Sequence, residues 1–361
     1  MLSRLQNDTD HLRIGVLGCG QIAQAAHFEA VRKAQNASLY AICDVAEDLL
    51  RRMAVQHEPN KTFTSYEQML SDDDIDAVVV AIADQFHVDA TLRALDAGKH
   101  VLVEKPLGVS IEECKLVAEK ADNTGLIVQV GSMKRFDPGI TQARAFINSA
   151  IGEVLALKAW YCDSTYRYSM TDTLQPLFAE NRDAKRPAGD PKLDKRRYFL
   201  LGHGSHLVDT ARFLGGDLVS VHARLVEKFG AYSWFVDTEF ESGANGHLDL
   251  TIAVRMDWHE GFQVYGEHGS VIGKTYNPWY LRSSDVECFS SADGSYRRIL
   301  GEDAHFYRLQ VEAFADRIHH GVDSGAATAQ DGLAAVQALV AIARSAKTGV
   351  RVRLDSVAGG P

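Results

Sequence analysis

The sequence has few cysteines, and they are not grouped in a way that would bind a metal or form a disulfide framework. Its five cysteines are scattered along 361 residues, and no two of them form a Cys-x-x-Cys pair. An odd, dispersed set argues against a disulfide scaffold and against a structural zinc site. We therefore expect reduced thiols, a cytoplasmic protein and no bound metal.

Long apolar segments and an excess of positive charge are also missing. No run of about 18 uninterrupted apolar residues occurs, and the N-terminus lacks the apolar core of a signal peptide, so we expect no membrane association. The 48 acidic residues outnumber 38 Lys and Arg residues, and this formal net charge of −10 disfavours nucleic acid as a partner. With 46 % hydrophobic residues, the composition is that of a packed globular protein with one large or two medium domains.

Short apolar runs alternate with amphipathic stretches in the first third of the chain. This pattern is typical of a doubly wound parallel sheet, in which helices cover both faces of each strand. We expect a Rossmann domain over residues 11–130, with Gly98 and Gly125 ending its last two helices. The expected strands are 13–17, 39–43, 77–82, 100–104 and 126–130, and the expected helices are 21–32, 47–56, 66–70, 87–97 and 111–123.

After Gly131 the apolar runs become longer and alternate more regularly with polar residues. Such alternation is typical of an antiparallel sheet with one covered face. We expect a second, α+β domain over residues 131–355, with a large, open, mostly antiparallel sheet and two closing helices. The expected strands are 154–161, 219–226, 247–256, 261–265 and 270–273, and the expected closing helices are 306–319 and 331–347.

The segment 18–23, Gly-Cys-Gly-Gln-Ile-Ala, lies between the first expected strand and the first expected helix. This is the context in which a G-x-G-x-x-G/A motif binds a dinucleotide. Gly18 permits a tight turn, Gly20 lets the backbone approach a pyrophosphate, and Ala23 lets the helix pack close to the sheet. The helix N-terminus adds N–H groups and the positive end of the dipole. The candidate cofactor contacts in this segment are Gly18, Gly20, Gln21 and Ile22.

Asp44 ends the second expected strand, 21 positions after Ala23. An acidic residue about 20 positions beyond the glycine motif binds the adenosine ribose hydroxyls and repels the 2′-phosphate of NADP. We therefore expect NAD as the cofactor and Asp44 as its ribose ligand. Two alternatives stay open: Asp44 is only a turn residue or the N-cap of the following helix, or Arg51 and Arg52 bind the 2′-phosphate of NADP.

Five segments, taken in order, resemble the Gfo/Idh/MocA family of glucose–fructose oxidoreductases and inositol 2-dehydrogenases. They are the loop that ends at His87, the Glu-Lys-Pro of 104–106, the segment 131–138, the G-x-H-x-x-D of 204–209 and the closing helix around 329–349. The resemblance covers Leu12 to Leu354. It implies an NAD-dependent dehydrogenase that oxidises a secondary hydroxyl of a sugar, a sugar derivative or a cyclitol.

The resemblance also implies roles for individual residues. Lys105 is expected to be the central catalytic and substrate-orienting residue, with Glu104 and His87 beside it at the cofactor. His206 is expected to be the second catalytic residue, oriented by Asp209 one helical turn further on. These roles suit the chemistry, because oxidation of an alcohol needs a base for the hydroxyl proton while the carbon gives hydride to the nicotinamide. The expected substrate contacts, besides Lys105 and His206, are Arg135, Tyr166, Arg182, His203 and Asp209.

Two departures from the family pattern bear on the reaction. Gly202 stands where inositol dehydrogenase-like members usually carry an aspartate that completes a Lys-Asp-His set. The candidates to replace that aspartate are His203, Asp163, Tyr161 and Tyr198. The segment 83–87 replaces a common Thr-Pro-Asn beside the nicotinamide ribose. Two alternatives therefore stay open: an NAD-dependent glycosidase or lyase that works by transient oxidation without net redox change, and a non-catalytic NAD-sensing protein.

An irregular segment, 171–195, interrupts the second expected domain, and a loop of that length is often functional. It overlaps a basic stretch, 182–197, with seven Lys or Arg residues and three Asp residues. One interpretation is recognition of an anionic sugar, with Arg182 as a contact. The other is a solvated or subunit-bridging loop.

Two further expectations concern surfaces of the second domain. The aromatic side chains between 160 and 168 either stack on a sugar ring or simply pack within the strand. The family resemblance also implies a homodimer or homotetramer built on the open face of the sheet.

Overall fold

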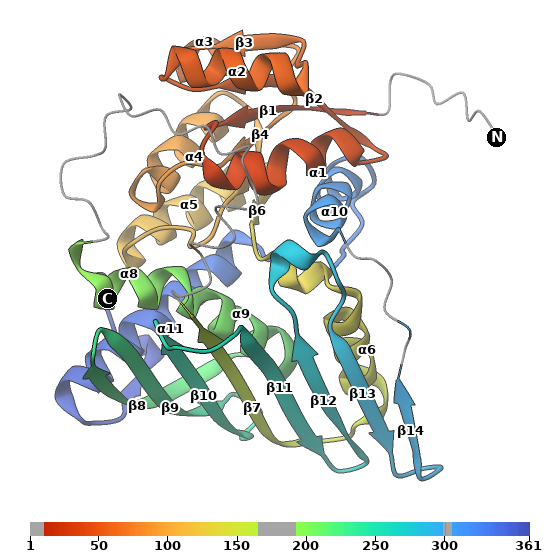
Figure 1. The fold of residues 1–361 in the computed structure, drawn as a ribbon, viewed down its shortest axis with the longest axis vertical. Coiled ribbons are helices and arrows are strands. Elements are labelled where there is room, and N and C mark those ends of the chain that lie inside the picture. Colours follow the sequence, from red (N-terminus) through yellow and green to blue (C-terminus); the bar gives the residue numbers. More distant parts are fainter. Residues whose placement is uncertain (1–10, 165–192, 299, 301–304) are drawn as a thin grey trace.

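The computed structural model describes residues 11–164, 193–298, 300 and 305–361, which form two sheets with helices packed between and around them (Figure 1). Within these residues, the first sheet has six parallel strands in the order β3-β2-β1-β4-β5-β6. The strand order reverses between β1 and β4, and doubly wound sheets bind ligands at the carboxyl ends beside such a point. The strands are β1 (Leu12–Leu17), β2 (Ala37–Cys43), β3 (Lys61–Phe63), β4 (Ala77–Val80), β5 (His100–Val103) and β6 (Val128–Val130).

Both faces of the first sheet are covered, which explains its continuous apolar strands. α1, α2 and α10 contribute to the core on one face, and α3, α4 and α5 contribute to the core on the other. The first helix begins with the π-helical turn Ala23–His27 and continues as α1 (Phe28–Lys33). The other helices of the two cores are α2 (Glu47–His57), α3 (Tyr66–Leu70), α4 (His87–Asp96), α5 (Ile111–Thr124) and α10 (Phe306–His320).

The second sheet has nine strands among the described residues, in the order β14-β13-β12-β11-β7-β10-β9-β8-β15. Only β7 and β10 pair in parallel there, so the prediction of a mostly antiparallel sheet is confirmed. The strands are β7 (Val154–Asp163), β8 (Leu218–Lys228), β9 (Ala231–Phe240), β10 (Asn245–Ile252), β11 (His259–Gly266), β12 (Gly269–Thr275), β13 (Asp285–Ser290), β14 (Ser295–Arg298) and β15 (Val352–Arg353).

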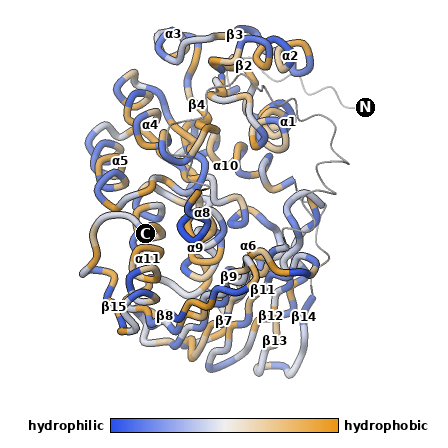
Figure 2. The backbone as a smooth tube through the Cα atoms, turned by 60° about the vertical axis from the view of Figure 1, so that its left-hand side comes forward, coloured by the Kyte–Doolittle hydropathy of each residue, from blue (hydrophilic) through white to orange (hydrophobic). Residues whose placement is uncertain are grey.

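Helices cover one face of the second sheet. α6 (Pro138–Ala150) packs on β12 and β13, α9 (Gly204–Gly215) packs on β7, and α11 (Ala329–Thr348) packs on β8. α11 also packs on α5, and Figures 1 and 2 both show it between the two sheets. α8 (Lys195–Gly202) directly precedes α9. The facing ends of the two sheets are thereby brought together around α9 and the end of β5.

The five strands and five helices expected for 11–130 all occur, with ends that differ by no more than two residues. Gly125 caps α5 with a φ of +68°, whereas α4 ends at Asp96 with Ala97 as its C-cap, and Gly98 follows with a φ of +73°. The sequence pattern did not predict β3, which is short and largely exposed, nor β9, β13, β14 and β15. α6 was not predicted either, because Pro138 opens that helix, where the side chain of Asp137 caps it by accepting from the N–H of Gly139 at 2.8 Å.

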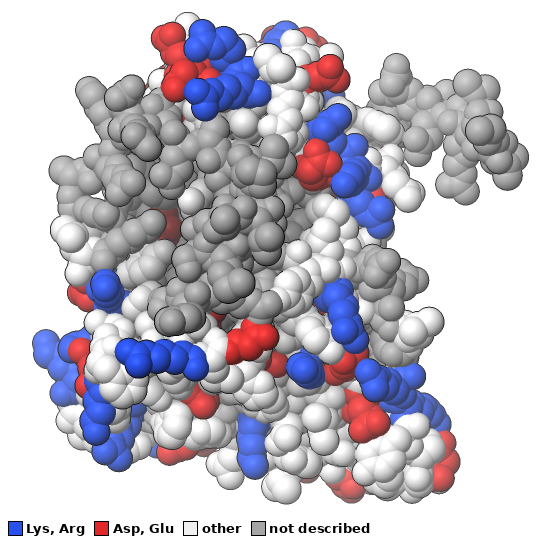
Figure 3. All heavy atoms as spheres, viewed as in Figure 1, with Lys and Arg blue, Asp and Glu red and all other residues white. Residues whose placement is uncertain are grey.

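The charged groups on the described surface carry no single sign. On the face seen in Figure 3, Lys and Arg side chains lie interspersed with Asp and Glu side chains. No helix in the described part of the chain is long and apolar enough to cross a membrane. A search of the same residues for three or more His, Cys, Asp or Glu side chains arranged to hold a metal found none.

Candidate active site

The loop 18–23 lies at the carboxyl end of β1 and opens the first helix. Gly18 has a φ of +98°, and a Cβ there would lie 2.4 Å from the carbonyl oxygen of Ala81, so only glycine fits. A Cβ at Gly20 would meet no described atom within 4 Å beyond its chain neighbours, so the backbone is open to a ligand. Gln21 is exposed and Ile22 is half-buried in the first helical turn. The residues present fit the pyrophosphate of a dinucleotide.

Asp44 follows β2 and is bonded to this loop. Its Oδ2 accepts from the N–H of Cys19 at 2.7 Å, and its Oδ1 accepts from the N–H of Ala46 at 2.8 Å. The N-cap of α2 is Ala46, so the interpretation of Asp44 as the cap is wrong, whereas its bond to the N–H of Ala46 makes it a turn residue as well as a candidate ribose ligand. A half-buried carboxylate beside the glycine loop suits ribose hydroxyls. Arg51 and Arg52 are exposed on α2.

Lys105 lies just after β5, and its side chain reaches the second domain. Its Nζ donates to the carbonyl oxygen of Gly202 at 3.2 Å. Because the helix is interrupted at His203, this carbonyl accepts from side chains, and Ser205 Oγ donates to it as well, at 3.1 Å. The peptide bond between Lys105 and Pro106 is cis. A lysine ammonium therefore lies at the carboxyl edge of the parallel sheet, where ligands bind.

Two buried side chains support the turn that carries Lys105. Glu104 Oε2 accepts from the N–H of Lys105 at 3.2 Å, and Glu104 Oε1 accepts from His27 at 2.9 Å. Both ring nitrogens of His87 lie within 3.0 Å of backbone carbonyl oxygens, that of Pro106 included. Glu104 and His87 therefore hold the turn in place, and a direct contact of either with the cofactor stays a prediction.

His203, His206 and Tyr161 form a cluster next to Gly202. The Oη of Tyr161 lies 3.3 Å from Nδ1 of His203, and its ring is parallel to the His206 ring with the centres 5.9 Å apart. Asp163 Oδ2 lies 3.6 Å from the same Nδ1 of His203. Tyr161 and Asp163 share a face of β7 because they are two positions apart. Of the residues considered as replacements for the missing aspartate, these three gather at one point, whereas Tyr198 packs against Phe199.

The electrostatics of the cluster keep both histidines neutral. Burial, together with the positive charges of Lys105 and Lys134, lowers the pKa of His203 to about 3. The same causes lower the pKa of His206 well below its ordinary value. A neutral imidazole can accept a proton from a substrate or from a neighbouring group.

Sequence analysis missed a buried ion pair in this cluster, between Lys134 and Glu260. The Lys134 ammonium pairs with Glu260 of β11 and lies 4.5 Å from the ring centre of Tyr161. Trp258 Nε1–H donates to the second oxygen of Glu260 at 3.2 Å. Burial lowers the pKa of Lys134 and raises that of Glu260. The available signal was that Lys134 lies in the segment 131–138 that resembles the family, beside Arg135.

Arg135 and Asp209 are bonded to each other, which corrects the role expected for Asp209. Arg135 donates to both oxygens of Asp209 at 2.8 to 3.1 Å, and both side chains are buried. Asp331 also pairs with Arg135, and Arg212 of α9 donates to the same carboxylate of Asp331. Asp209 therefore neutralises Arg135 rather than orienting His206. The network holds α9 against α11 and against the turn that follows β6.

The two neighbouring aromatic residues of β7 lie on opposite faces of the sheet. Tyr161 faces the cluster, whereas Trp160 stacks on His259 with ring centres 5.7 Å apart. This follows from the alternation of side chains along a strand. Trp160 therefore packs within the sheet instead of lining the site.

Two expected substrate contacts, Tyr166 and Arg182, lie outside the described residues, as does most of the segment 171–195. The basic stretch re-enters the described chain at α8, whose N-cap is Asp194. There Arg196 donates to Glu227 at 2.5 Å, and Arg197 donates to the carbonyl oxygen of Val109 at 3.3 Å. The side chains of Arg196 and Arg197 are therefore bonded to other parts of the same chain.

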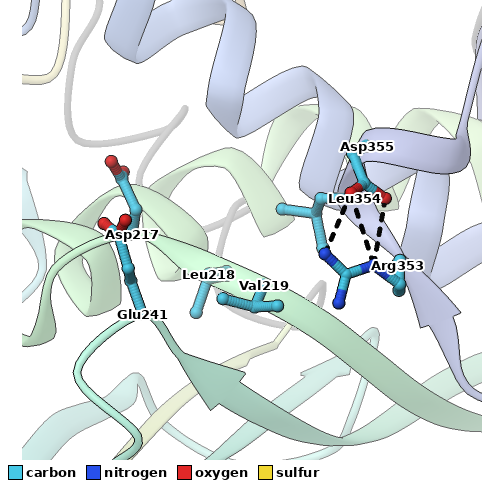
Figure 4. Close-up of a pocket in the computed structure, with 7 residues that line it drawn as sticks. All are labelled: Asp217, Leu218, Val219, Glu241, Arg353, Leu354 and Asp355. Carbon is cyan, nitrogen blue, oxygen red and sulfur yellow. Dashed lines mark hydrogen bonds and ion pairs between the residues drawn. The ribbon is translucent and has the colours of Figure 1, made fainter.

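A hollow of about 250 Å³ lies at one edge of the large sheet, away from the Lys105 cluster (Figure 4). Its cation, Arg353, is bonded to Asp355 at 2.9 Å. Its charged groups are exposed, and none of them belongs to the Lys105 cluster, so we assign it no function. The lining residues are Asp217, Leu218, Val219, Glu241, Arg353, Leu354 and Asp355.

Known proteins resemble this chain over nearly its whole length. Scyllo-inositol 2-dehydrogenase (NAD(+)) of Bacillus subtilis (strain 168) is 27 % identical over 95 % of this chain and 96 % of its own length. Myo-inositol 2-dehydrogenase of Thermotoga maritima is 24 % identical over 96 % of this chain and 100 % of its own length. A structure of levoglucosan dehydrogenase with NADH and L-sorbose matches with a TM-score of 0.79 at 19 % identity, over 96 % of this chain and 100 % of that one. That structural match supports the fold alone.

Two family profiles match consecutive parts of the chain. The profile described as "Oxidoreductase family, NAD-binding Rossmann fold" matches residues 12–132, and the "GFO/IDH/MocA C-terminal domain" matches residues 140–272. Together they cover more than half of the sequence, in the order that the two sheets show. This protein therefore belongs to the GFO/IDH/MocA family of NAD-binding oxidoreductases.

Proposed function

We propose that this protein is an NAD-dependent dehydrogenase that oxidises a secondary hydroxyl of a sugar, a sugar derivative, anionic ones included, or a cyclitol. The observation that carries the proposal is the contact between Lys105 and Gly202, because it holds the amino group of Lys105 beside two neutral histidines at the carboxyl edge of the Rossmann sheet. Alcohol oxidation needs proton-transferring groups next to the nicotinamide. Relatives named inositol 2-dehydrogenase support the same substrate class.

The proposed NAD site follows the carboxyl edge of the first sheet. When bound, NAD supplies the nicotinamide that accepts the hydride. The carboxylate of Asp44 would repel a 2′-phosphate, which supports NAD over NADP. We assign the pyrophosphate to Gly18, Gly20, Gln21 and Ile22, the adenosine ribose to Asp44, and the nicotinamide end to His87, Glu104 and Lys105.

Lys105 and His206 handle the proton of the substrate hydroxyl in this proposal. In its neutral amine form, Lys105 accepts a hydrogen bond from the substrate hydroxyl and takes its proton as the carbon is oxidised, which leaves Lys105 as an ammonium. His206 is neutral, because burial and the charges of Lys105 and Lys134 lower its pKa, and we assign to it a hydrogen bond with the substrate and the relay of the proton. The parallel ring of Tyr161 holds the imidazole of His206 in one orientation.

His203 replaces the aspartate that relatives carry at position 202. Tyr161 and Asp163 both lie near its Nδ1, at 3.3 Å and 3.6 Å, so they orient the ring and leave Nε2 for the substrate. Trp258 adds an aromatic surface beside Lys134. Tyr166 and Arg182 remain proposed contacts outside the described residues, whereas we assign the buried pair of Arg135 and Asp209 to the frame of the site.

We also propose a homodimer or homotetramer built on the open face of the second sheet. Phe235, Tyr265 and Ile272 are exposed on that face, on three different strands. Exposed apolar side chains on an uncovered sheet face are typical of an interface between subunits. Sedimentation velocity, with and without a Phe235→Lys substitution, tests it: a wild-type monomer would contradict the proposal.

Screening sugars, sugar acids and cyclitols with NAD and with NADP tests the proposed function. We expect stoichiometric NADH formation with at least one member of the panel. Cleavage of a glycoside without accumulation of NADH would instead favour the glycosidase or lyase mechanism. A higher kcat/KM with NADP would overturn the choice of cofactor.

A further inference from the structure

A buried histidine and a buried carboxylate connect the dinucleotide-binding helix to the turn that carries Lys105. His27 and Glu104 are 0 % and 6 % exposed, and Nε2–H of His27 donates to Oε1 of Glu104 at 2.9 Å. The other oxygen of Glu104 accepts from the backbone N–H of Lys105 at 3.2 Å. The helix that begins at the glycine loop is therefore linked to Lys105 through one carboxylate.

The local backbone explains how His27 reaches Glu104. Ala23–His27 is a π-helical turn, and the N–H of Phe28 donates to the carbonyl of Ala23, five positions earlier. Such a turn holds one residue more than an α-helical turn and is frequent at functional sites. Gly131 makes room on the other side, because a Cβ there would lie 3.2 Å from Oε1 of Glu104.

The pair is buried, and an aromatic ring packs against His27. Tyr307 of α10 meets the His27 ring edge-on, with centres 6.0 Å apart, and it stacks on Trp279 at 6.3 Å. Burial raises the pKa of Glu104, but the hydrogen bond and charge of His27, together with Lys105 and His87, outweigh it, and the pKa is lowered. Glu104 is therefore a negative charge beside Lys105 at neutral pH.

We propose that His27 is a positioning residue: by holding the carboxylate of Glu104 in place, it sets the position of Lys105 against the dinucleotide helix and the negative charge that Lys105 experiences. The catalytic consequence rests on the proposed function, whereas the electrostatic consequence concerns the folded chain alone. Without the hydrogen bond from His27, burial acts on Glu104 with less opposition, the carboxyl takes up a proton, and Lys105 loses the charge beside it.

Other ionisable groups face this pair and bear on the same test. They are His87 and Tyr307 near Glu104, and His203, His206 and Lys134 near Lys105. A substitution at His27 leaves all of these residues in the chain. Of the groups that contact His27, Glu104 is the one bonded to Lys105, so a change in the reactivity of Lys105 reports on Glu104.

The first test measures the reactivity of Lys105 in the whole protein without substrate. Acetic anhydride acylates neutral amines, and peptide mass spectrometry compares Lys105 with the exposed Lys158 in the same sample. We expect His27→Leu and Glu104→Gln each to raise the Lys105 rate relative to that of Lys158, by about tenfold for each unit by which the pKa of the amine falls. His27→Gln, whose amide can donate in place of Nε2, should restore the wild-type ratio. An unchanged ratio in His27→Leu would overturn the proposal.

His57 provides a matched control in the same domain. It is buried, and its Nδ1 lies 3.6 Å from Glu29 rather than near Lys105. His57→Leu should lower the thermal stability without changing the acylation ratio, and an equal change in both variants would make the effect of His27 merely structural, which also overturns the proposal.

With a substrate in hand, His27→Leu should lower kcat by about tenfold to a hundredfold through displacement of Lys105. Fluorescence titration should find the Kd for NAD nearly unchanged. If the wild type oxidises no sugar or cyclitol, the proposed function fails, and the acylation ratios still decide the role of His27.

Discussion

The ammonium group of Lys105 lies 3.2 Å from the carbonyl oxygen of Gly202, and this contact joins the end of the first sheet to the break between α8 and α9. A neutral carbonyl stabilises an ammonium less than a carboxylate does. Glycine in place of aspartate at position 202 therefore disfavours the charged form of Lys105, the proposed base, as well as changing what holds it in position.

Restoring that carboxylate is the first prediction. A Cβ at position 202 would meet no described atom within 4 Å, so the side chain has room. Gly202→Asp should shift the acid limb of the kcat/KM profile to higher pH by about one unit, because a carboxylate favours the charged form of Lys105. Gly202→Asn has the same shape without the charge and should leave the limb in place. Identical profiles for the two variants would contradict the prediction.

Removal of the proposed base is the second prediction. Lys105→Met should lower kcat by about 10²- to 10⁴-fold, the usual contribution of general acid–base catalysis, with little change in NAD binding. Lys105→Arg should not rescue the rate, because a guanidinium stays protonated. Steady-state kinetics and fluorescence titration measure the two effects. Lys158→Met, on an exposed lysine, should behave as the wild type.

Acid sensitivity of the fold is the third prediction. The pKa of His203 is about 3 in the folded chain, because of burial and nearby lysines, against 6.5 for an ordinary histidine. The unfolded chain therefore takes up the proton first, and stability falls as the pH drops from about 6.5 towards 3. At pH 5 the loss due to His203 is about 2 kcal/mol.

Urea unfolding at pH 7 and pH 5 measures that loss. His203→Gln should be less destabilised by the change of pH than the wild type by this amount. His222→Gln, on an exposed histidine, should keep the wild-type dependence. An equal loss in His203→Gln and the wild type would mean that another group is responsible.

Cofactor choice is the fourth prediction. Asp44→Ser removes the carboxylate that would repel a 2′-phosphate, so the ratio of kcat/KM with NADP to that with NAD should rise by roughly tenfold, equivalent to about 1.4 kcal/mol. Glu47→Ser removes an exposed acid from the first turn of α2 and should leave the ratio unchanged. A constant ratio in Asp44→Ser would show that other groups select the cofactor.

The buried network behind α9 leads to the fifth prediction. Arg135→Met leaves Asp209 as a buried, unpaired charge and should destabilise the fold by about 3–5 kcal/mol. Arg135→Met combined with Asp209→Leu removes both charges and should recover most of that loss. Thermal and urea unfolding compare the two variants. A double variant that is less stable than the single one would contradict this explanation.

Residue types and their spacing were sufficient for the parts of the protein that depend on short-range interactions. The alternation of buried strands and amphipathic helices predicted the first sheet, because each strand there is covered on both faces. The glycine loop and Asp44 were also predictable, since Cys19 and Asp44, which meet in the fold, are only 25 positions apart. The cluster of Lys105, His203 and His206 followed from the family resemblance.

The pairing of buried charges depended instead on the folded chain. Lys134 meets Glu260 across 126 positions, and Arg135 meets Asp209 across 74. A buried charge needs a partner, but neither local periodicity nor composition says which distant strand or helix supplies it. Asp209 was therefore expected beside His206, one turn away, whereas packing of α9 against the turn after β6 turned it towards Arg135.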